Sequence, residues 1–186
     1  MSYRDLNQDV ERVLVSEEQI KEAVARIARK IDEDEKDSDK QLMLLGILKG
    51  SVVFMGELMK KIKTPMEIEF MKVSSYGAST VSSGALKVTL DLHRDDLGKY
   101  DVVIVEDIID SGNTLTNLVN YLRCMGAGNV RTCTLLDKPS RRKVPFEPDY
   151  VGVIVPDEFV VGYGLDYDEK YRELPYVGVL KREVYQ

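Results

Sequence analysis

The strongest constraint on how this 186-residue chain folds is the segment Val102–Leu115, Val-Val-Ile-Val-Glu-Asp-Ile-Ile-Asp-Ser-Gly-Asn-Thr-Leu. It begins with four apolar, β-branched residues, which predict a strand buried on both faces, as in parallel sheets. Apolar residues then recur at helical spacing, at Leu115, Leu118, Val119 and Leu122. A buried strand that leads directly into a helix indicates an α/β fold, with a mostly parallel central sheet flanked by helices.

The rest of the chain repeats this alternation of strand and helix. Ser16-Glu-Glu-Gln19 has the form of a capping box and predicts the start of one helix, and a second helix is expected from Val52 to Met59. Further strands are expected over residues 11–15, 42–48, 66–73, 86–92, 130–136, 151–155, 159–161 and 176–180. A chain of this length that is 44% hydrophobic can bury one core, so we expect a single domain, residues 1–186.

Three carboxylates follow the buried strand. Glu106 and Asp107 come directly after it, and Asp110 precedes the small-residue turn Ser111–Thr114. Ligands of open α/β sheets bind beyond the carboxyl ends of the strands, where a following helix directs its first N–H groups. Because carboxylates repel a phosphate, the pattern predicts a ligand that combines a phosphate with a diol and a divalent cation. The alternative is an ordinary acidic first helical turn, which stabilises the helix dipole by about 0.3–1 kcal/mol per charge.

This segment resembles the phosphoribosyl pyrophosphate motif of the type I phosphoribosyltransferases. That motif is an apolar strand, two acids, two apolar residues, an acid, and then Ser/Thr-Gly-x-Thr. The competing phosphate loop, Gly-x-x-x-x-Gly-Lys-Ser/Thr, occurs nowhere in the chain. The resemblance implies the type I phosphoribosyltransferase fold, Mg²⁺ as cofactor, and a phosphoribosyl site made of Glu106, Asp107, Asp110, Ser111, Gly112, Asn113 and Thr114.

A second strand end carries Lys49-Gly50-Ser51, which from the residues alone is either an anion site or a plain turn between strand and helix. A Lys-Gly turn offers an anion an ammonium group and exposed backbone N–H groups. The turn looks like the family's pyrophosphate loop, which assigns Lys49 and Gly50 to pyrophosphate. Resemblance to the purine-salvage members also suggests a cis peptide between Leu48 and Lys49.

The stretch from Ser74 to Gly84 is rich in small hydroxyl residues and predicts a mobile loop. Long loops within a compact domain are commonly lids or binding loops. Resemblance to the purine members places their lid at about residues 74–84, with the start of that lid matched by Ser74, Ser75, Tyr76 and Gly77.

The C-terminal third resembles the purine-binding hood of the hypoxanthine-guanine phosphoribosyltransferases, through Asp157-Glu-Phe-Val-Val-Gly-Tyr-Gly-Leu-Asp-Tyr167. The resemblance, which extends over residues 13–180, implies a small hood formed by the N-terminal strand and about residues 156–186. It assigns Lys138 to the 6-oxo group of the purine, Phe159 to stacking, and the backbone of Val160 to the pyrimidine edge. It places Asp166 beside the purine as a magnesium ligand and Arg172 at pyrophosphate.

The reaction implied by the resemblance is transfer of ribose 5-phosphate from phosphoribosyl pyrophosphate to hypoxanthine or guanine. The products are IMP or GMP and pyrophosphate, with Asp110 as the general base and Mg²⁺ held by Glu106, Asp107 and Asp166. A 6-oxopurine is favoured by Lys138 with Phe159, but xanthine, adenine and pyrimidines remain alternatives. A catalytically inactive nucleotide-binding regulator is the alternative from another class. The family resemblance further implies a homodimer or homotetramer.

Composition argues against nucleic acids and membranes as partners. A net charge of −6 argues against a general nucleic-acid surface, which shows a basic excess. No run approaches the ~18 apolar residues of a membrane span, and the N-terminus lacks the apolar core of a signal peptide. We therefore expect a cytoplasmic protein without membrane contacts.

Overall fold

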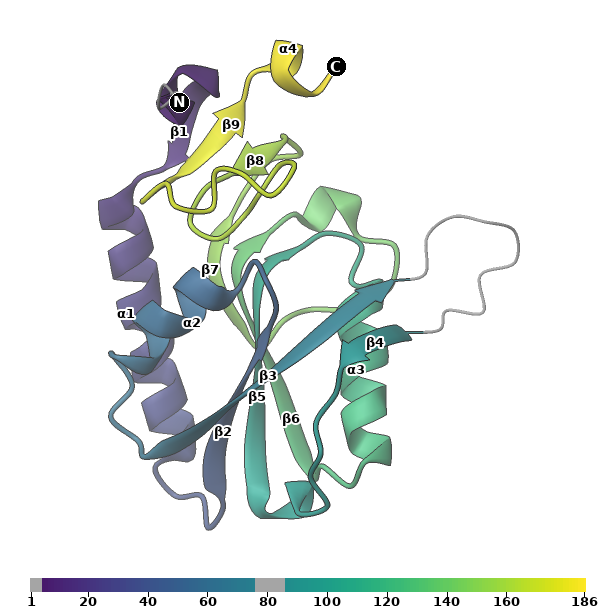
Figure 1. The fold of residues 1–186 in the computed structure, drawn as a ribbon. Helices are drawn as coiled ribbons and strands as arrows, with labels where there is room; N and C mark the ends of the chain where they lie inside the picture. Colours follow the sequence, from purple (N-terminus) through teal and green to yellow (C-terminus); the bar gives the residue numbers. More distant parts are fainter. Residues whose placement is uncertain (1–4, 76–85) are drawn as a thin grey trace.

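A six-stranded sheet forms the centre of the computed structural model, which describes residues 5–75 and 86–186 (Figure 1). Neighbouring strands pair in parallel except β4, which is antiparallel to β3. The mostly parallel sheet predicted from the sequence is therefore confirmed. Across the sheet the strands are β4 (Leu86–Leu90), β3 (Met66–Ser75), β2 (Gln41–Ile47), β5 (Tyr100–Ile109), β6 (Asn129–Asp137) and β7 (Tyr150–Ile154).

Helices cover both faces of this sheet, as Figure 1 shows. Helices α1 (Glu17–Glu35) and α2 (Val52–Met59) pack on one face, and α3 (Asn113–Cys124) packs on the other. Alternate residues of β5 serve the two layers, since Val103 and Val105 join the core beneath α1 and α2, whereas Val102 and Ile104 join the core beneath α3. This double burial explains why β5 is apolar at consecutive positions. The predicted capping box at the start of α1 is also present.

A second, antiparallel sheet lies beyond the carboxyl ends of the central strands, with both chain termini beside it (Figure 1). We call it the hood sheet, and its strands in spatial order are β1 (Val10–Val15), β9 (Val177–Leu180) and β8 (Val160–Val161). Short helices flank it at Leu6–Asp9 and at α4 (Arg182–Tyr185). The hood sheet thus joins segments from the two ends of the chain.

Two strands extend further than the sequence indicated. Strand β5 continues to Ile109, so Glu106 and Asp107 lie inside its last four residues instead of after it. The ladder continues because β6 supplies partners, with Glu106 opposite Thr134. Likewise Ser74 and Ser75 belong to β3 and pair with β4, which corrects the expected start of the loop. The other residues assigned to the lid, including Tyr76 and Gly77, lie outside the described residues.

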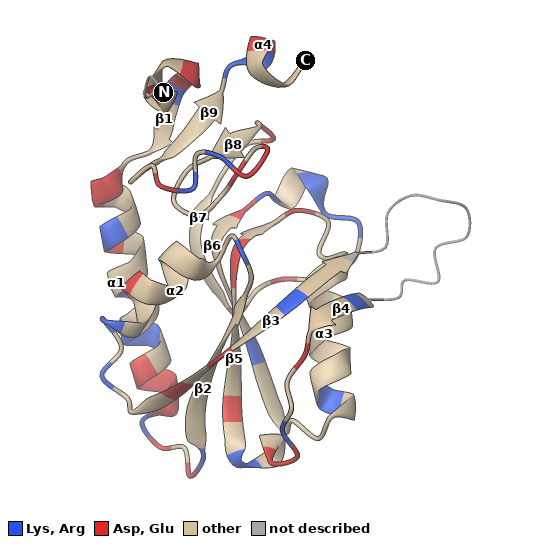
Figure 2. Ribbon diagram, viewed as in Figure 1, with Lys and Arg blue, Asp and Glu red and all other residues tan. Residues whose placement is uncertain are grey.

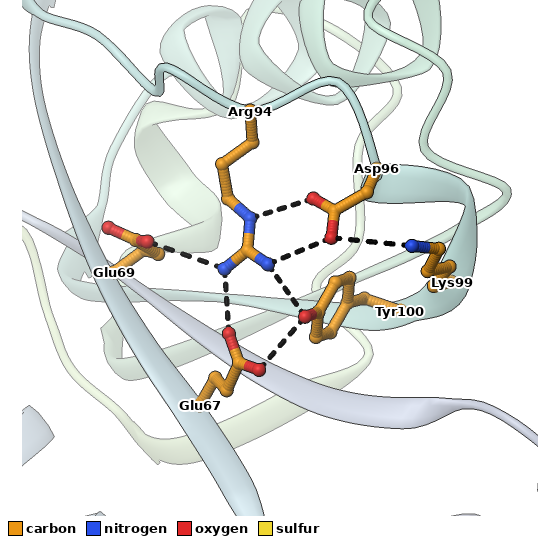
Figure 3. A network of polar contacts seen from close by, with 6 residues as sticks. All are labelled: Glu67, Glu69, Arg94, Asp96, Lys99 and Tyr100. Carbon is orange, nitrogen blue, oxygen red and sulfur yellow. Dashed lines mark hydrogen bonds and ion pairs between the residues drawn. The ribbon is translucent and has the colours of Figure 1, made fainter.

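A polar network centred on Arg94 holds the opposite, amino-terminal edge of the sheet (Figure 3). The guanidinium contacts Glu67 of β3 at 2.7 Å, Asp96 at 2.9 Å and the hydroxyl of Tyr100 at 2.6 Å. The Tyr100 hydroxyl in turn donates to Glu67 at 2.9 Å. This clamp ties the connection between β4 and β5 to the start of β3, at the edge that faces away from the hood sheet.

Among the described residues, no helix has the length and apolarity needed to cross a bilayer.

Candidate functional site

Three backbone segments meet tightly at the carboxyl end of β2 and β5. The turn after β2 contains a cis peptide between Leu48 and Lys49, as the resemblance to the purine-salvage members suggested. Gly50 lies against Asp107 on one side and against Gly164, in the loop between β8 and β9, on the other. A Cβ atom on Gly164 would lie 3.1 Å from the carbonyl carbon of Gly50 and closer still to its oxygen. The two glycines therefore allow the turn after β2, strand β5 and the β8–β9 loop to approach one another.

Glu106 and Asp107 form an electrostatically costly pair on β5. Atom Oε2 of Glu106 is enclosed and has no hydrogen-bond partner within the described structure. Burial raises the pKa of the Glu106 carboxyl well above its usual range, and the charge of Asp107 raises it further. Burial also raises the pKa of Asp107 to about 6, against the opposing hydrogen bond that the Ile108 N–H donates at 2.8 Å. A cation or a set of hydroxyl donors placed here would stabilise the charged form of both carboxylates and so lower their pKa values.

The segment from Asp110 to Thr114 forms the turn into α3. Gly112 is the N-cap and has a φ of 81°, a left-handed conformation that glycine adopts without penalty. The helix begins at Asn113, so Asn113 and Thr114 belong to its first turn, and the Ser111 hydroxyl accepts a hydrogen bond from the Asn113 N–H at 3.3 Å. Backbone N–H groups at such a helix start form a site for an anion such as phosphate.

The cations predicted for pyrophosphate are paired with acids from the β8–β9 loop, along which Figure 2 shows basic and acidic segments. Nζ of Lys49 lies 2.9 Å from Oε2 of Glu169. Arg172 contacts Asp166 at 2.9 Å and Glu169 at 3.2 Å, and it donates to the carbonyl oxygen of Gly164 at 2.7 Å. The structure thus brings Lys49 and Arg172 to a common partner, Glu169, from two distant parts of the sequence.

A cavity of about 340 Å³ lies between the end of β5 and the hood sheet. Lys138 is only 4% exposed, and its ammonium donates to the carbonyl oxygen of Glu158 at 2.7 Å. The same ammonium lies 3.9 Å from Oδ1 of Asp110. The ring of Phe159 is 40% exposed. The lining consists of Ile108, Asp110, Lys138, Arg141, Asp157, Glu158, Phe159, Val160, Leu165 and Tyr185.

The cavity therefore combines a carboxylate, an ammonium group and an aromatic face, which suits a flat heterocycle with polar edges. Of the residues predicted for the purine, Lys138, Phe159 and Val160 line it together with Asp110. Asp166 does not line it and instead faces Arg172, so the structure separates Asp166 from the other three. Within residues 5–75 and 86–186, no three acidic, histidine or cysteine side chains lie close enough together to hold a metal ion. This includes Glu106, Asp107 and Asp166, which the resemblance assigned to Mg²⁺.

Several residues of the site were not found from the sequence. Ile108 and Leu165 are apolar residues that line the cavity, Arg141 lies at its wall, and Glu169 links the two cations. Tyr185 stacks on Phe159 with ring centroids 4.6 Å apart and planes inclined by 17°. Ile108 and Leu165 lie inside the matched motifs but look like ordinary apolar residues, Arg141 and Glu169 lie only near a motif, and no motif surrounds Tyr185.

Comparison with known proteins is consistent across sequence and structure. The family model for the phosphoribosyl transferase domain matches residues 14–168. The hypoxanthine-guanine phosphoribosyltransferase of Bacillus subtilis is 49% identical over 181 residues, which cover 97% of this chain and 99% of that protein. A crystal structure of a hypoxanthine phosphoribosyltransferase from Staphylococcus aureus superposes with a TM-score of 0.91 at 43% identity, covering 100% of both chains.

The chain also matches part of a larger protein. The bifunctional protein TilS/HprT of Listeria innocua is 48% identical over 180 residues, and these cover 97% of this chain but 27% of that protein. The chain thus spans about a quarter of the length of this relative.

Proposed function

The chain belongs to the phosphoribosyl transferase domain family, and we propose that it transfers the 5-phosphoribosyl group of phosphoribosyl pyrophosphate to hypoxanthine or guanine. The products are IMP or GMP and pyrophosphate. The observation that carries this proposal is the cavity of about 340 Å³ in which Asp110, Lys138 and Phe159 meet beside the end of β5. The names of the relatives that match nearly end to end agree with it.

The ribosyl group is bound between the carboxylates of β5 and the start of α3. In the transition state, positive charge develops on the sugar, and Glu106 and Asp107 stabilise it by holding the ribose diol, either directly or, if they held Mg²⁺, through that ion. Ser111, Gly112, Asn113 and Thr114 bind the 5-phosphate with hydroxyl and backbone N–H groups. The raised pKa of Asp107 and the unpartnered oxygen of Glu106 support this role, because both carboxylates gain donors when the sugar binds.

The departing pyrophosphate is bound by Lys49, the N–H of Gly50 and Arg172. Both cations are paired with Glu169, Lys49 at 2.9 Å and Arg172 at 3.2 Å. Pyrophosphate oxygens therefore replace the Glu169 carboxylate, and the cations need little rearrangement because they already lie at the turn.

The donor set fits Mg²⁺ that is bound together with the substrate. Mg²⁺ commonly uses one or two protein carboxylates plus substrate oxygens, so the absence of a three-ligand group among the described residues agrees with this mode. One or two of Glu106, Asp107 and Asp166 would supply the carboxylates, and the unpartnered Oε2 of Glu106 is the observation that supports the fit. When bound, Mg²⁺ neutralises charge on the leaving pyrophosphate.

The purine is bound in the cavity under the hood sheet. Lys138 donates to its 6-oxo group, Phe159 stacks on its ring, and the backbone of Val160 contacts its pyrimidine edge. Asp110 accepts the proton of the purine nitrogen as the new glycosidic bond forms.

We further propose that residues 1–186 form one domain, and that the protein acts in the cytoplasm and assembles into a homodimer or homotetramer. Family membership supports this setting.

Product formation from phosphoribosyl pyrophosphate and Mg²⁺ tests the proposal. Hypoxanthine, guanine, xanthine, adenine and orotate are supplied separately, and nucleotides are resolved by chromatography. IMP and GMP are the expected products. Turnover of xanthine, adenine or orotate alone would reassign the base, and no product with intact phosphoribosyl pyrophosphate binding would favour a regulator.

A further inference from the structure

We propose that Arg142 is a positioning residue for this reaction, because its guanidinium joins the backbone of Asp110 to the carboxylate of Asp137. Nη1 donates to the carbonyl oxygen of Asp110 at 2.6 Å. Nη2 forms a charged hydrogen bond with Oδ1 of Asp137. The inference rests on the proposed function, since it assigns Arg142 a task that acts through the general base.

One end of this bridge is fixed by the central sheet. Asp137 is the last residue of β6, pairs with Ile109 of β5, and accepts a hydrogen bond at its backbone oxygen from the Val155 N–H at 2.8 Å. The side chains of Asp137 and Arg142 are 9% and 14% exposed, respectively. A planar guanidinium can make both bonds at once, and charge-assisted bonds shielded from water are stronger than exposed ones.

The other end of the bridge holds the turn from Asp110 to Thr114, which is proposed to bind the phosphoribosyl group. Residues 142–146, which we call the strap, cross this turn at three consecutive positions. Beyond the Arg142 bond to Asp110, the N–H of Lys143 donates to the carbonyl oxygen of Ser111 at 3.0 Å. A Cβ atom on Gly112 would lie 3.1 Å from Cδ of Arg142 and 3.2 Å from Cβ of Phe146. The turn is therefore packed against the strap as well as hydrogen-bonded to it.

Arg142 does not line the base cavity, whereas its neighbour Arg141 does. It therefore acts by fixing the peptide that carries Asp110 and not by touching the purine. Fixing this peptide sets the direction of the Asp110 carboxylate, whose Oδ1 is 3.9 Å from Nζ of Lys138. It also sets the direction of the N–H groups that follow and bind the 5-phosphate. A displacement of about 1 Å at such a centre costs on the order of 10²-fold in rate.

The test measures kcat and both KM values for Arg142→Ala and Arg142→Lys in the full-length protein. The expected loss in kcat/KM for phosphoribosyl pyrophosphate is about 10²-fold for Arg142→Ala, from a higher KM and a lower kcat together. The KM for hypoxanthine should stay within about 3-fold, because Lys138 and Phe159 keep their positions. Guanidinium ion at millimolar concentration should restore part of the activity of Arg142→Ala. Arg142→Lys should lose less kcat/KM than Arg142→Ala, because its ammonium can still satisfy one end of the bridge. It should not reach the wild-type value, because one ammonium cannot satisfy both ends.

Arg131→Ala is the matched control. Arg131 lies on β6, the strand that carries Asp137, has a side chain 15% exposed, and forms an ion pair with the buried Glu35 of α1. This variant should lose thermal stability yet keep both KM values and show no guanidinium rescue. If Arg142→Ala and Arg131→Ala both showed a lower kcat with unchanged KM values, the loss would reflect fewer folded molecules. That result would overturn the proposal. If Arg142→Ala does not fold, wild-type kinetics in Arg142→Lys would overturn it equally. Wild-type turnover, measured beforehand, tests the proposed function separately.

Discussion

Gly50 and Asp107 are packed so closely that a Cβ atom on the glycine would lie 2.5 Å from Cγ of the aspartate and nearer still to its Oδ2. The two residues belong to different strand ends, and each is assigned to a different part of phosphoribosyl pyrophosphate. Their contact therefore fixes the distance between the proposed pyrophosphate site and the proposed ribose site.

Gly50→Ala is expected to lower kcat/KM for phosphoribosyl pyrophosphate by about 10²-fold. The added methyl group must displace either the Asp107 carboxylate or the turn that carries Lys49. Steady-state kinetics, together with calorimetric titration of the ligand and Mg²⁺, measure the effect. Gly56→Ala is the control, because Gly56 lies within α2 and a Cβ atom there meets nothing within 4 Å. It should keep the kinetics and stabilise the protein by about 0.5–1 kcal/mol. Wild-type kinetics in Gly50→Ala would contradict the role of this contact.

Asp107→Asn is expected to stabilise the ligand-free protein above pH 6. Burial raises the folded-state pKa of Asp107 to about 6, from an ordinary value of 3.8. A raised carboxyl pKa means that the folded state holds the proton more tightly than the unfolded state, so stability falls as pH rises from about 4 to about 6. The cost above pH 6 is at most about 3 kcal/mol, and asparagine removes it.

Urea unfolding of wild type and Asp107→Asn at several pH values measures this difference. The two proteins should differ most at pH 7–8 and converge near pH 4. Asn can still accept the Ile108 N–H at Oδ1, so the backbone bond is kept. A constant difference between pH 4 and pH 8 would show that Asp107 does not titrate in this range.

The motif on β5 shows what could be predicted from sequence. Its apolar run, its carboxylates and the glycine of the turn are contiguous, so the strand, the helix and the anion site follow from local patterns. The length of β5 does not, because Glu106 joins the ladder only where β6 supplies Thr134 as partner. Strand ends are decided by neighbouring strands, which local sequence does not contain.

The walls of the base cavity depend even more on tertiary structure. Lys138 and Phe159 were found because they lie in motifs with a family resemblance. Tyr185 is the last residue but one and has no motif around it, and Arg142 is recognisable only from its contact with the backbone of Asp110, 32 positions earlier. Such contacts require the hood and the strap to be in place.

Asp110→Ala is expected to keep affinity for phosphoribosyl pyrophosphate while losing about 10²- to 10⁴-fold in kcat. In the proposed mechanism the Asp110 carboxylate accepts the purine proton, whereas the phosphate contacts come from the backbone and hydroxyl groups that follow it. Single-turnover and steady-state assays with hypoxanthine measure kcat, and calorimetry measures ligand affinity. Asp95→Asn, an exposed acid in the connection before β5, should leave both unchanged. Unchanged turnover in Asp110→Ala would remove Asp110 as the general base.

Tyr185→Ala is expected to weaken binding of the purine without affecting phosphoribosyl pyrophosphate. The Tyr185 ring stacks on Phe159 at 4.6 Å, and Tyr167 meets Phe159 edge-on at 5.6 Å, so Phe159 is held from two directions. Loss of one aromatic pair costs about 0.5–1.5 kcal/mol, which corresponds to a rise of about 2- to 10-fold in KM for hypoxanthine. Tyr185→Phe keeps the ring and should retain the wild-type KM. Because Tyr185 lines the base cavity but has no contact with Lys49 or Arg172 among the described interactions, the KM for phosphoribosyl pyrophosphate should stay within about 2-fold. Equal hypoxanthine KM values for Tyr185→Ala and Tyr185→Phe would show that the Tyr185 ring does not help Phe159 to bind the purine.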